Sequence, residues 1–195
     1  MNEVNLLSRF WEGFELEQVS ECSGDGLLLR LRPKSDTAPC CSGCSQRTLL
    51  IHDVTLRRVR ERDLFDQRVW LEVPVRRVRC IHCGVRTEHI AWLAGRRRLT
   101  IALINHVEAL ARLLHIRHVA GLLGLHWHTV KAIDHERLRR EVVEPDRRGL
   151  RRLIMDEFAL YKGHRYATVV ACADTQQVLW VGEGRSREAI RPFFD

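Results

Sequence analysis

Two pairs of cysteines constrain this chain more than any other feature of its sequence. They are Cys41-Ser-Gly-Cys44 and Cys80-Ile-His-Cys83. A tight turn with two thiolates three positions apart presents both sulfurs to one metal ion, and two such turns complete a tetrahedral zinc site. We therefore predict a structural zinc ion bound by Cys41, Cys44, Cys80 and Cys83, because four thiolates leave no open coordination position.

The spacing leaves some choice among the ligands. Cys40 could replace Cys41 in a C-x3-C spacing, and His52 and His82 are alternative ligands. Four buried thiols without a metal are the less favoured interpretation, because two such pairs in a reducing compartment seldom have another purpose.

The segment between the two pairs has the pattern of β-structure. Val69, Leu71, Val73 and Val75 alternate with residues of other types, which is the period of two of a strand. We expect a β-hairpin or small meander that brings the cysteine pairs together, within a small zinc-binding β domain at residues 1–92.

The charge of the chain points to a polyanionic partner. The formal net charge is +7, and arginine supplies almost all of the positive charge. Nucleic acid is the usual partner of such a chain. No apolar run approaches the ~20 residues of a membrane span, and the first residues lack the pattern of a signal peptide. We expect a cytoplasmic protein with no membrane partner.

Residues 93–146 have the pattern of three helices. Thr100 is a plausible N-cap for the first. The second is expected at about 116–123, and the third from residue 126 or 127 to about 143, before Pro145. The apolar stripe of the first helix consists of Leu103, Val107, Leu110 and Leu114.

The second and third helices have the spacing of a helix-turn-helix. Ala120 allows close helix crossing, and Gly124 allows the tight turn. In that motif the second helix enters the major groove of double-stranded DNA, although a plain three-helix bundle is the alternative. The predicted DNA-contacting residues are those of a basic arm and of the start of the third helix: Arg96, Arg97, Arg98, His126, Trp127, His128 and Lys131.

Residues 147–195 are expected to start a new unit. Its expected elements are strands at 153–160, 166–173 and 178–182, a turn at Lys162-Gly163-His164, and a helix capped by Ser186. Three strands followed by a helix, with Asp156 inside the first strand, suggest a ribonuclease-H-like α/β core. Mg²⁺ requires carboxylate oxygens held on rigid elements, so Asp156 is the predicted catalytic residue and magnesium ligand.

Neighbouring acids are weaker candidates. Glu157 points to the opposite face of the strand from Asp156, and we expect it to pair with Lys162 or Arg165. Asp174 lies at a hairpin turn, where aspartate is favoured for local hydrogen bonds. A plain strand-edge carboxylate is the alternative interpretation of Asp156.

The order of these features resembles the insertion-sequence transposases of the ISL-three family. The matching pieces are "CSGC", "VRRVRC", "CIHC", the helix-turn-helix, "IMDEFALYKGHRYATVVACAD" and "VLWVGEGRSREAIRPFF". The resemblance implies a transposase that binds element ends through its N-terminal half, and that cuts and joins DNA with a DDE core and Mg²⁺. By that match Asp156 is the first catalytic aspartate.

The chain departs from the family pattern at its end. In that family the second aspartate and the glutamate follow the first helix of the core, whereas this chain ends inside that helix, at Asp195. We therefore expect a fragment that lacks the complete DDE site and is inactive alone. The alternatives are a zinc-containing DNA-binding regulator without catalysis and, less favoured, an RNA-binding module. A homo-oligomer is compatible with the sequence.

The predicted fold is therefore α+β and multi-domain. It comprises a small β zinc-binding domain, a helical helix-turn-helix domain, and the start of a ribonuclease-H-like α/β core.

Overall fold

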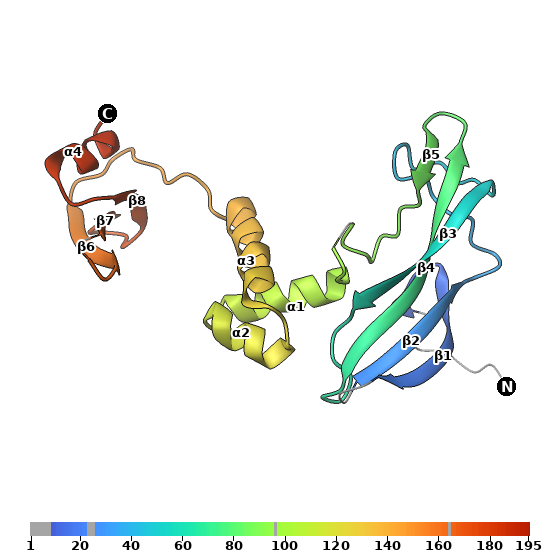
Figure 1. The fold of residues 1–195 in the computed structure, drawn as a ribbon. Coiled ribbons are helices and arrows are strands. Elements are labelled where there is room, and N and C mark those ends of the chain that lie inside the picture. The colour runs from blue at the N-terminus through green and yellow to red at the C-terminus, as the bar shows by residue number, and fades with distance from the viewer. Residues whose placement is uncertain (1–8, 23–25, 96, 164) are drawn as a thin grey trace. The chain divides into compact units, whose positions relative to one another are not determined.

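The computed structural model contains both helices and strands, as predicted, and divides into two compact units (Figure 1). They are Met1–Arg137 and Leu138–Asp195. Among the residues that the structure describes, no helix is long and apolar enough to cross a membrane. The boundaries of the three predicted domains stay predictions. The structure describes all residues except 1–8, 23–25, 96 and 164.

The first unit is built on a five-stranded sheet. Its strands are β1 (Phe14–Cys22), β2 (Gly26–Pro33), β3 (Ile51–Arg60), β4 (Arg68–Cys80) and β5 (Gly84–Thr87). The order is β1-β2-β4-β3, with β5 also paired to β4. All neighbours are antiparallel except β2 and β4, which are parallel. The predicted hairpin between the cysteine pairs is confirmed as β3 and β4.

The alternation in β4 gives the sheet a buried and an outer face. Val69, Leu71 and Val73 are buried in a core that also contains Trp11 and Phe14. Because successive side chains of a strand point to opposite faces, the residues between them lie on the outer face. The apolar period of two in the sequence therefore identified the core side of β4 correctly.

Three helices follow the sheet: α1 (Ile101–Ala111), α2 (Ile116–Leu123) and α3 (Trp127–Glu141), and the first unit ends within α3, at Arg137. The Thr100 side chain accepts a hydrogen bond of 3.2 Å from the backbone N–H of Leu103, so the predicted N-cap is confirmed. The core of the helical region consists of Leu99, Leu103, Val107, Val119, Ala120, Leu123, Val130 and Ile133.

The predicted apolar stripe of the first helix was wrong at its end. Leu114 lies after the last residue of α1 and is 38% exposed, because the helix ends at Ala111. Gly124 ends α2 in the left-handed conformation, with φ of 59°. Glycine adopts this conformation without the steric penalty that a Cβ atom brings, so the chain can turn sharply before α3.

The second unit is a three-stranded antiparallel sheet followed by a short helix. The elements are β6 (Leu153–Tyr161), β7 (Arg165–Cys172), β8 (Val178–Glu183), α4 (Arg187–Ile190) and a 3-10 turn at Arg191–Phe193. The strand order is β6-β7-β8. The predicted sequence of three strands and a helix is confirmed. The Ser186 side chain caps α4 by accepting a hydrogen bond from the backbone N–H of Ala189.

The core of the second unit is small. It consists of Val170, Cys172, Leu179 and Phe193. Every residue of β6 is exposed, and β6 lies at an edge of the described sheet. The strand that carries Asp156 is therefore an exposed edge strand of the described sheet.

Candidate metal centre

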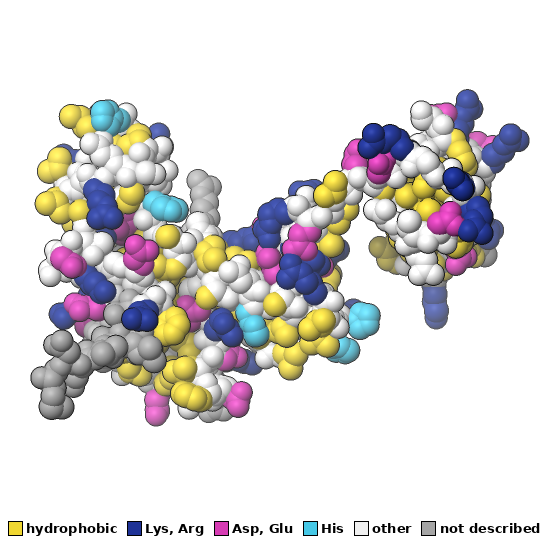
Figure 2. Space-filling model, turned by 180° about the vertical axis from the view of Figure 1, so that it is seen from behind, with side chains coloured by type: hydrophobic (Ala, Val, Ile, Leu, Met, Phe, Trp, Pro, Cys, Tyr) yellow, Lys and Arg dark blue, Asp and Glu magenta, His cyan; other side chains and the backbone are white. Residues whose placement is uncertain are grey.

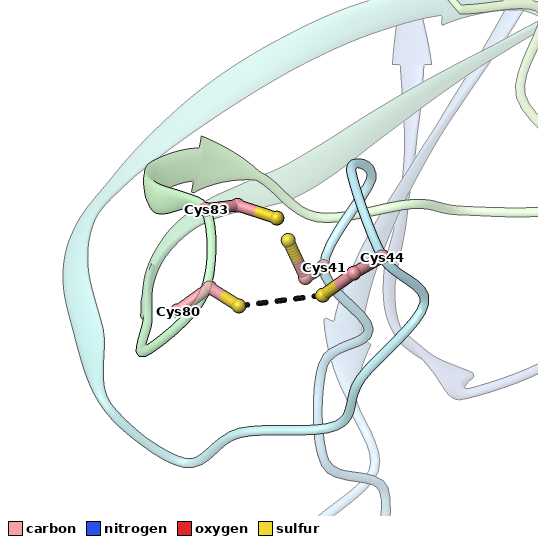
Figure 3. Close-up of side chains that lie close together, drawn as sticks. All are labelled: Cys41, Cys44, Cys80 and Cys83. Carbon is pink, nitrogen blue, oxygen red and sulfur yellow. Dashed lines mark hydrogen bonds between the residues drawn. The ribbon is translucent and has the colours of Figure 1, made fainter.

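The sheet brings the two cysteine pairs together. Cys41 and Cys44 lie in the segment between β2 and β3, and Cys80 and Cys83 lie at the turn between β4 and β5. Figure 3 shows the four side chains directed toward one another. Their Sγ atoms all lie within 4.8 Å of one another, and those of Cys44 and Cys80 are 3.4 Å apart. Zinc–thiolate bonds of about 2.3 Å place tetrahedral sulfurs roughly 3.8 Å apart, so the cluster has the right size for zinc.

The backbone around the cluster also fits a bound metal. The N–H of Gly43 donates a hydrogen bond of 3.4 Å to Cys41 Sγ, which orients that sulfur. A Cβ atom at Gly43 would lie 3.0 Å from Cys83 Sγ, so glycine is the residue that leaves room for the sulfurs. Gly84 follows the second pair with φ of 69°, which lets the chain turn back into β5.

The thiols of the metal-free cluster differ strongly in acidity. Hydrogen bonds from the backbone N–H groups of His82 and Cys83 lower the pKa of Cys80 to about 6. The hydrogen bond with the Cys44 side chain, together with burial, raises the pKa of Cys83 to about 12. Four thiols this close cannot all ionise without a cation, because like charges oppose one another. Cys41, Cys44, Cys80 and Cys83 could hold a divalent metal ion, which would supply the missing positive charge.

The alternative ligands lie outside the cluster. Cys40 Sγ instead donates to the backbone carbonyl of Ser45, at 2.9 Å. His52 Nδ1 lies 2.8 Å from Asp53. His82 is not part of the group either. Within the described part of the chain, the four predicted cysteines form the only group of three or more potential metal ligands.

A buried ion pair beside the cluster was not predicted from the sequence. Glu88 follows β5 and accepts three hydrogen bonds from Arg76 of β4, one of them from the backbone N–H. Both side chains are at most 8% exposed. Glu88 also forms a β-bridge with Cys41, so this pair ties the first cysteine to the central strand. No pattern in the sequence distinguishes these two residues from the many other charged ones.

The residues predicted to contact DNA at the start of α3 lie together on the surface. His126, Trp127, His128 and Lys131 are all exposed. The ring centroids of Trp127 and His128 are 3.7 Å apart, and Lys131 Nζ lies 5.9 Å from the centroid of the Trp127 ring. In Figure 2 the helical region shows arginine and lysine side chains beside acidic ones, together with histidines and hydrophobic side chains.

The two described arginines of the predicted basic arm differ in their surroundings. Arg97 forms an ion pair with Glu136 of α3, whereas Arg98 is exposed. Arg96 lies outside the described residues. The arm therefore contacts α3 through Arg97, and Arg98 is the described member that faces solvent.

Asp156 lies on β6, where its carboxylate accepts a hydrogen bond of 2.8 Å from the backbone N–H of Glu157. In the described structure, no group of three or more potential metal ligands includes Asp156. Glu157 does not pair with Arg165 as predicted, because Arg165 forms its ion pair with Glu183 on the facing strand. Asp174 pairs with Arg152.

Comparison with known proteins matches two regions of the chain, one of which contains the cysteine cluster and the other Asp156, to models of transposase domains. A family model described as the zinc-finger of transposase IS204/IS1001/IS1096/IS1165 matches residues 37–83, and an ISL-three model described as Transposase matches residues 153–195. The first match contains all four clustered cysteines, so it supports a structural zinc ion together with their geometry.

Curated relatives extend the similarity along most of the chain. The chain is 44% identical over 188 residues to the transposase for insertion sequence element IS1001 of Bordetella parapertussis, which covers 95% of this chain and 46% of the relative. It is 28% identical over 190 residues to the transposase for IS1557 of Mycobacterium tuberculosis, which covers 94% and 42%.

The chain thus spans less than half of the length of the relatives it matches. No solved structure matches it. The predicted resemblance is confirmed: the chain is similar in sequence to insertion-sequence transposases, and two of its segments match models of the ISL-three family.

Proposed function

We propose that this chain is the DNA-binding part of an insertion-sequence transposase and that it binds the ends of its element as double-stranded DNA. The observation that carries the proposal is the 44% identity to the IS1001 transposase along 95% of the chain. The four-cysteine cluster lies within the matched zinc-finger segment, and its geometry supports the same proposal.

In this proposal Cys41, Cys44, Cys80 and Cys83 bind one structural zinc ion. The metal joins the segment before β3 to the turn after β4, and it neutralises thiolates that would otherwise repel one another. It takes no part in chemistry, because a site with four thiolate ligands has no free position for a substrate or water.

The α2–α3 pair acts as a helix-turn-helix in this proposal, and α3 enters the major groove. Three features support this role. Gly124 makes the tight turn, Ala120 is buried between the helices, and the exposed start of α3 carries His126, Trp127, His128 and Lys131. Side chains at the start of a recognition helix are those that reach base edges and phosphates.

The test is binding of a labelled duplex that carries an end of the insertion sequence, measured by fluorescence anisotropy. Lys131→Ala should weaken binding roughly tenfold, since a charged hydrogen bond is lost. Lys34→Ala, which removes the same charge from the segment after β2, is the matched control and should bind like wild type. Equal affinity of all three proteins would contradict the placement of α3, and absence of duplex binding by wild type would contradict the proposed function.

The catalytic part of the proposal concerns Asp156. We propose that it is a Mg²⁺ ligand of a ribonuclease-H-like core, and the match of residues 153–195 to the transposase model supports this role. Phosphoryl transfer with two metal ions needs several carboxylates. Mg²⁺-dependent nicking of duplex DNA that is lost in Asp156→Ala and kept in Glu157→Ala would support the assignment. Nicking that survives Asp156→Ala would refute it.

A second candidate function is DNA binding without catalysis. The observation in its favour is the isolation of Asp156, which belongs to no group of three potential ligands among the described residues. Such a chain would occupy element ends as a zinc-containing regulator. Sequence-specific DNA binding, together with a Mg²⁺ affinity that Asp156→Ala leaves unchanged, would favour this candidate over the transposase.

A further inference from the structure

An arginine-lined cavity lies in the first unit, apart from the cysteine cluster. It has a volume of about 450 Å³. It is lined by residues from the end of β3, the start of β4 and the turn between α2 and α3. We call it the arginine pocket, and the residues that matter in it are Arg58, Arg60, Arg68, Trp70, Arg98 and Gly124.

The strand register explains why these side chains converge. Arg60 of β3 lies directly opposite Trp70 of β4. Arg68 and Trp70 alternate with the buried Val69 and Leu71, so both point to the outer face of the sheet. The sheet therefore presents one aromatic ring with guanidinium groups around it.

Arg60 already has a structural role. It is only 2% exposed, and its guanidinium donates to the carbonyl oxygens of Val69 at 3.2 Å and of Leu123 at 3.3 Å. It also forms an ion pair with Asp63. Its charge is thus largely neutralised, and it joins the sheet to the end of α2.

The other arginines of the pocket keep free donors. Arg58 lies 4.9 Å from the centre of the Trp70 ring and donates to Cys22 Sγ at 2.6 Å, which fixes the orientation of its guanidinium. Arg68 and Arg98 have no ion pair with any residue that the structure describes. The guanidinium of Arg68 lies against Gly124, where an added Cβ would be 2.7 Å from its Cζ atom.

Among the residues that the structure describes, the acidic side chains near the pocket do not balance this charge. Asp63 is paired with Arg60. Glu72, the next outward residue of β4 after Trp70, is paired with Arg30 at 2.6 Å. The pocket therefore carries an excess of positive charge that is held in place by the strands. The planar donor fork of arginine matches the geometry of a phosphate group.

We propose that the arginine pocket binds a backbone phosphate of double-stranded DNA through Arg58, Arg68 and Arg98. The proposal rests on the proposed function, because Gly124 at the pocket wall directly precedes the segment that leads into α3. The same duplex can then place a phosphate in the pocket and its major groove at the start of α3. Phosphate contacts of this kind set the register of a protein on DNA and carry no sequence information.

The experiment measures binding of a labelled mixed-sequence duplex to the full chain over a series of KCl concentrations. Arg68→Ala and Arg98→Ala should each weaken binding roughly tenfold and reduce the slope of log K against log salt by about 1. Arg68→Lys keeps the charge but loses the donor fork, so its affinity should fall between those of wild type and Arg68→Ala. Arg79→Ala, an exposed arginine at the other end of β4, is the matched control and should behave like wild type.

The outcomes separate this proposal from the one on which it rests. Pocket variants that bind like wild type, while Lys131→Ala is weakened, would overturn the pocket alone. Equal losses in Arg68→Ala and Arg79→Ala would also overturn it, since they would reflect bulk charge. Absence of duplex binding by wild type would overturn both proposals. Saturable binding of inorganic phosphate that is lost in Arg68→Ala, with unchanged DNA affinity, would assign the pocket to a small anion instead. Zinc content and thermal melting check that each variant is folded.

Discussion

Cys40 and Cys41 are neighbours in sequence but have different surroundings. Cys41 is fully buried within the cluster, whereas Cys40 turns away and bonds to the Ser45 carbonyl. Either spacing, C-x2-C or C-x3-C, satisfied the sequence pattern. The choice between them depends on the strand bridges on both sides of the pair, which Cys40 forms with Arg47 and Cys41 forms with Glu88.

This difference gives a matched pair of substitutions. Cys41→Ser should reduce the zinc content from about one ion per chain to nearly none and should unfold the first unit, because metal binding and folding are coupled in small zinc sites. Cys40→Ser removes a thiol from the adjacent position and should keep the metal. Elemental analysis and circular dichroism test both variants. Loss of zinc in Cys40→Ser with retention in Cys41→Ser would reverse the ligand assignment.

The acidity of the cluster predicts how zinc affinity depends on pH. The pKa of Cys83 is raised to about 12, so zinc must displace its proton at neutral pH. The pKa of Cys80 is lowered to about 6, so above pH 7 this thiol is already ionised and adds little dependence. The association constant should rise with pH, about tenfold per pH unit for each displaced proton. Competition with a chromophoric chelator between pH 6.5 and 8 measures this slope, and a flat profile would contradict it.

At the scale of elements, the sequence patterns predicted the features that depend on a few neighbouring residues. The cysteine pairs, the period of two in β4 and the Thr100 cap all have signatures within a few residues, and each is confirmed. The parallel pairing of β2 with β4 has no such signature, because β3 separates them in the sequence. The arginine pocket likewise depends on two strand ends and a distant turn. The length of α1 was missed because Leu114 continued its apolar stripe beyond the true end.

Two glycines of the helical region provide a test of the turn. Gly124→Ala should destabilise the unit by about 1–2 kcal/mol, because a left-handed residue with a Cβ is strained and the new atom would meet Arg68. Gly121 lies within α2, and a Cβ there would enter open space. Gly121→Ala should therefore stabilise by about 0.5–1 kcal/mol. Urea unfolding of both variants measures the difference. Equal effects would show that the turn is not constrained as described.

The buried ion pair beside the cluster should contribute more to the stability of the first unit than ion pairs on the surface. Glu88→Ala leaves Arg76 buried and unpaired, which should destabilise the first unit by about 3–5 kcal/mol. Glu15→Ala breaks the solvent-exposed pair with Arg32 and should change stability by less than about 1 kcal/mol. Denaturant unfolding of the zinc-loaded proteins compares them. Similar losses in the two variants would mean that burial of the Arg76–Glu88 pair has no energetic consequence.

At the scale of the whole molecule, the two units differ in the size of their cores. The first unit has one apolar core in its sheet and another between its helices. The described core of the second unit consists of four residues, and β6 is exposed along its whole length. Stability depends on the apolar surface that a unit buries, so the second unit should be the less stable.

Limited trypsin digestion tests whether the second unit is less stable than the first. The enzyme should first cut at the arginines around 147–152 and within the second unit, and it should leave a resistant fragment that ends between about Arg137 and Arg147. Removal of zinc by a chelator before digestion should abolish that fragment, since the first unit then loses its metal. A resistant fragment from the C-terminal unit instead would contradict the comparison of the two cores.

The parallel pairing of β2 with β4 also sets an order of events during folding. The β3–β4 and β4–β5 hairpins join neighbouring segments, so their loops close early and quickly. These hairpins carry Cys80 and Cys83, and the segment with Cys41 and Cys44 leads directly into β3. The β1–β2 hairpin can dock only on an edge of β4 that has already formed. The nascent chain can therefore capture its metal before the sheet is complete, and β1–β2 docking is the slower, later step.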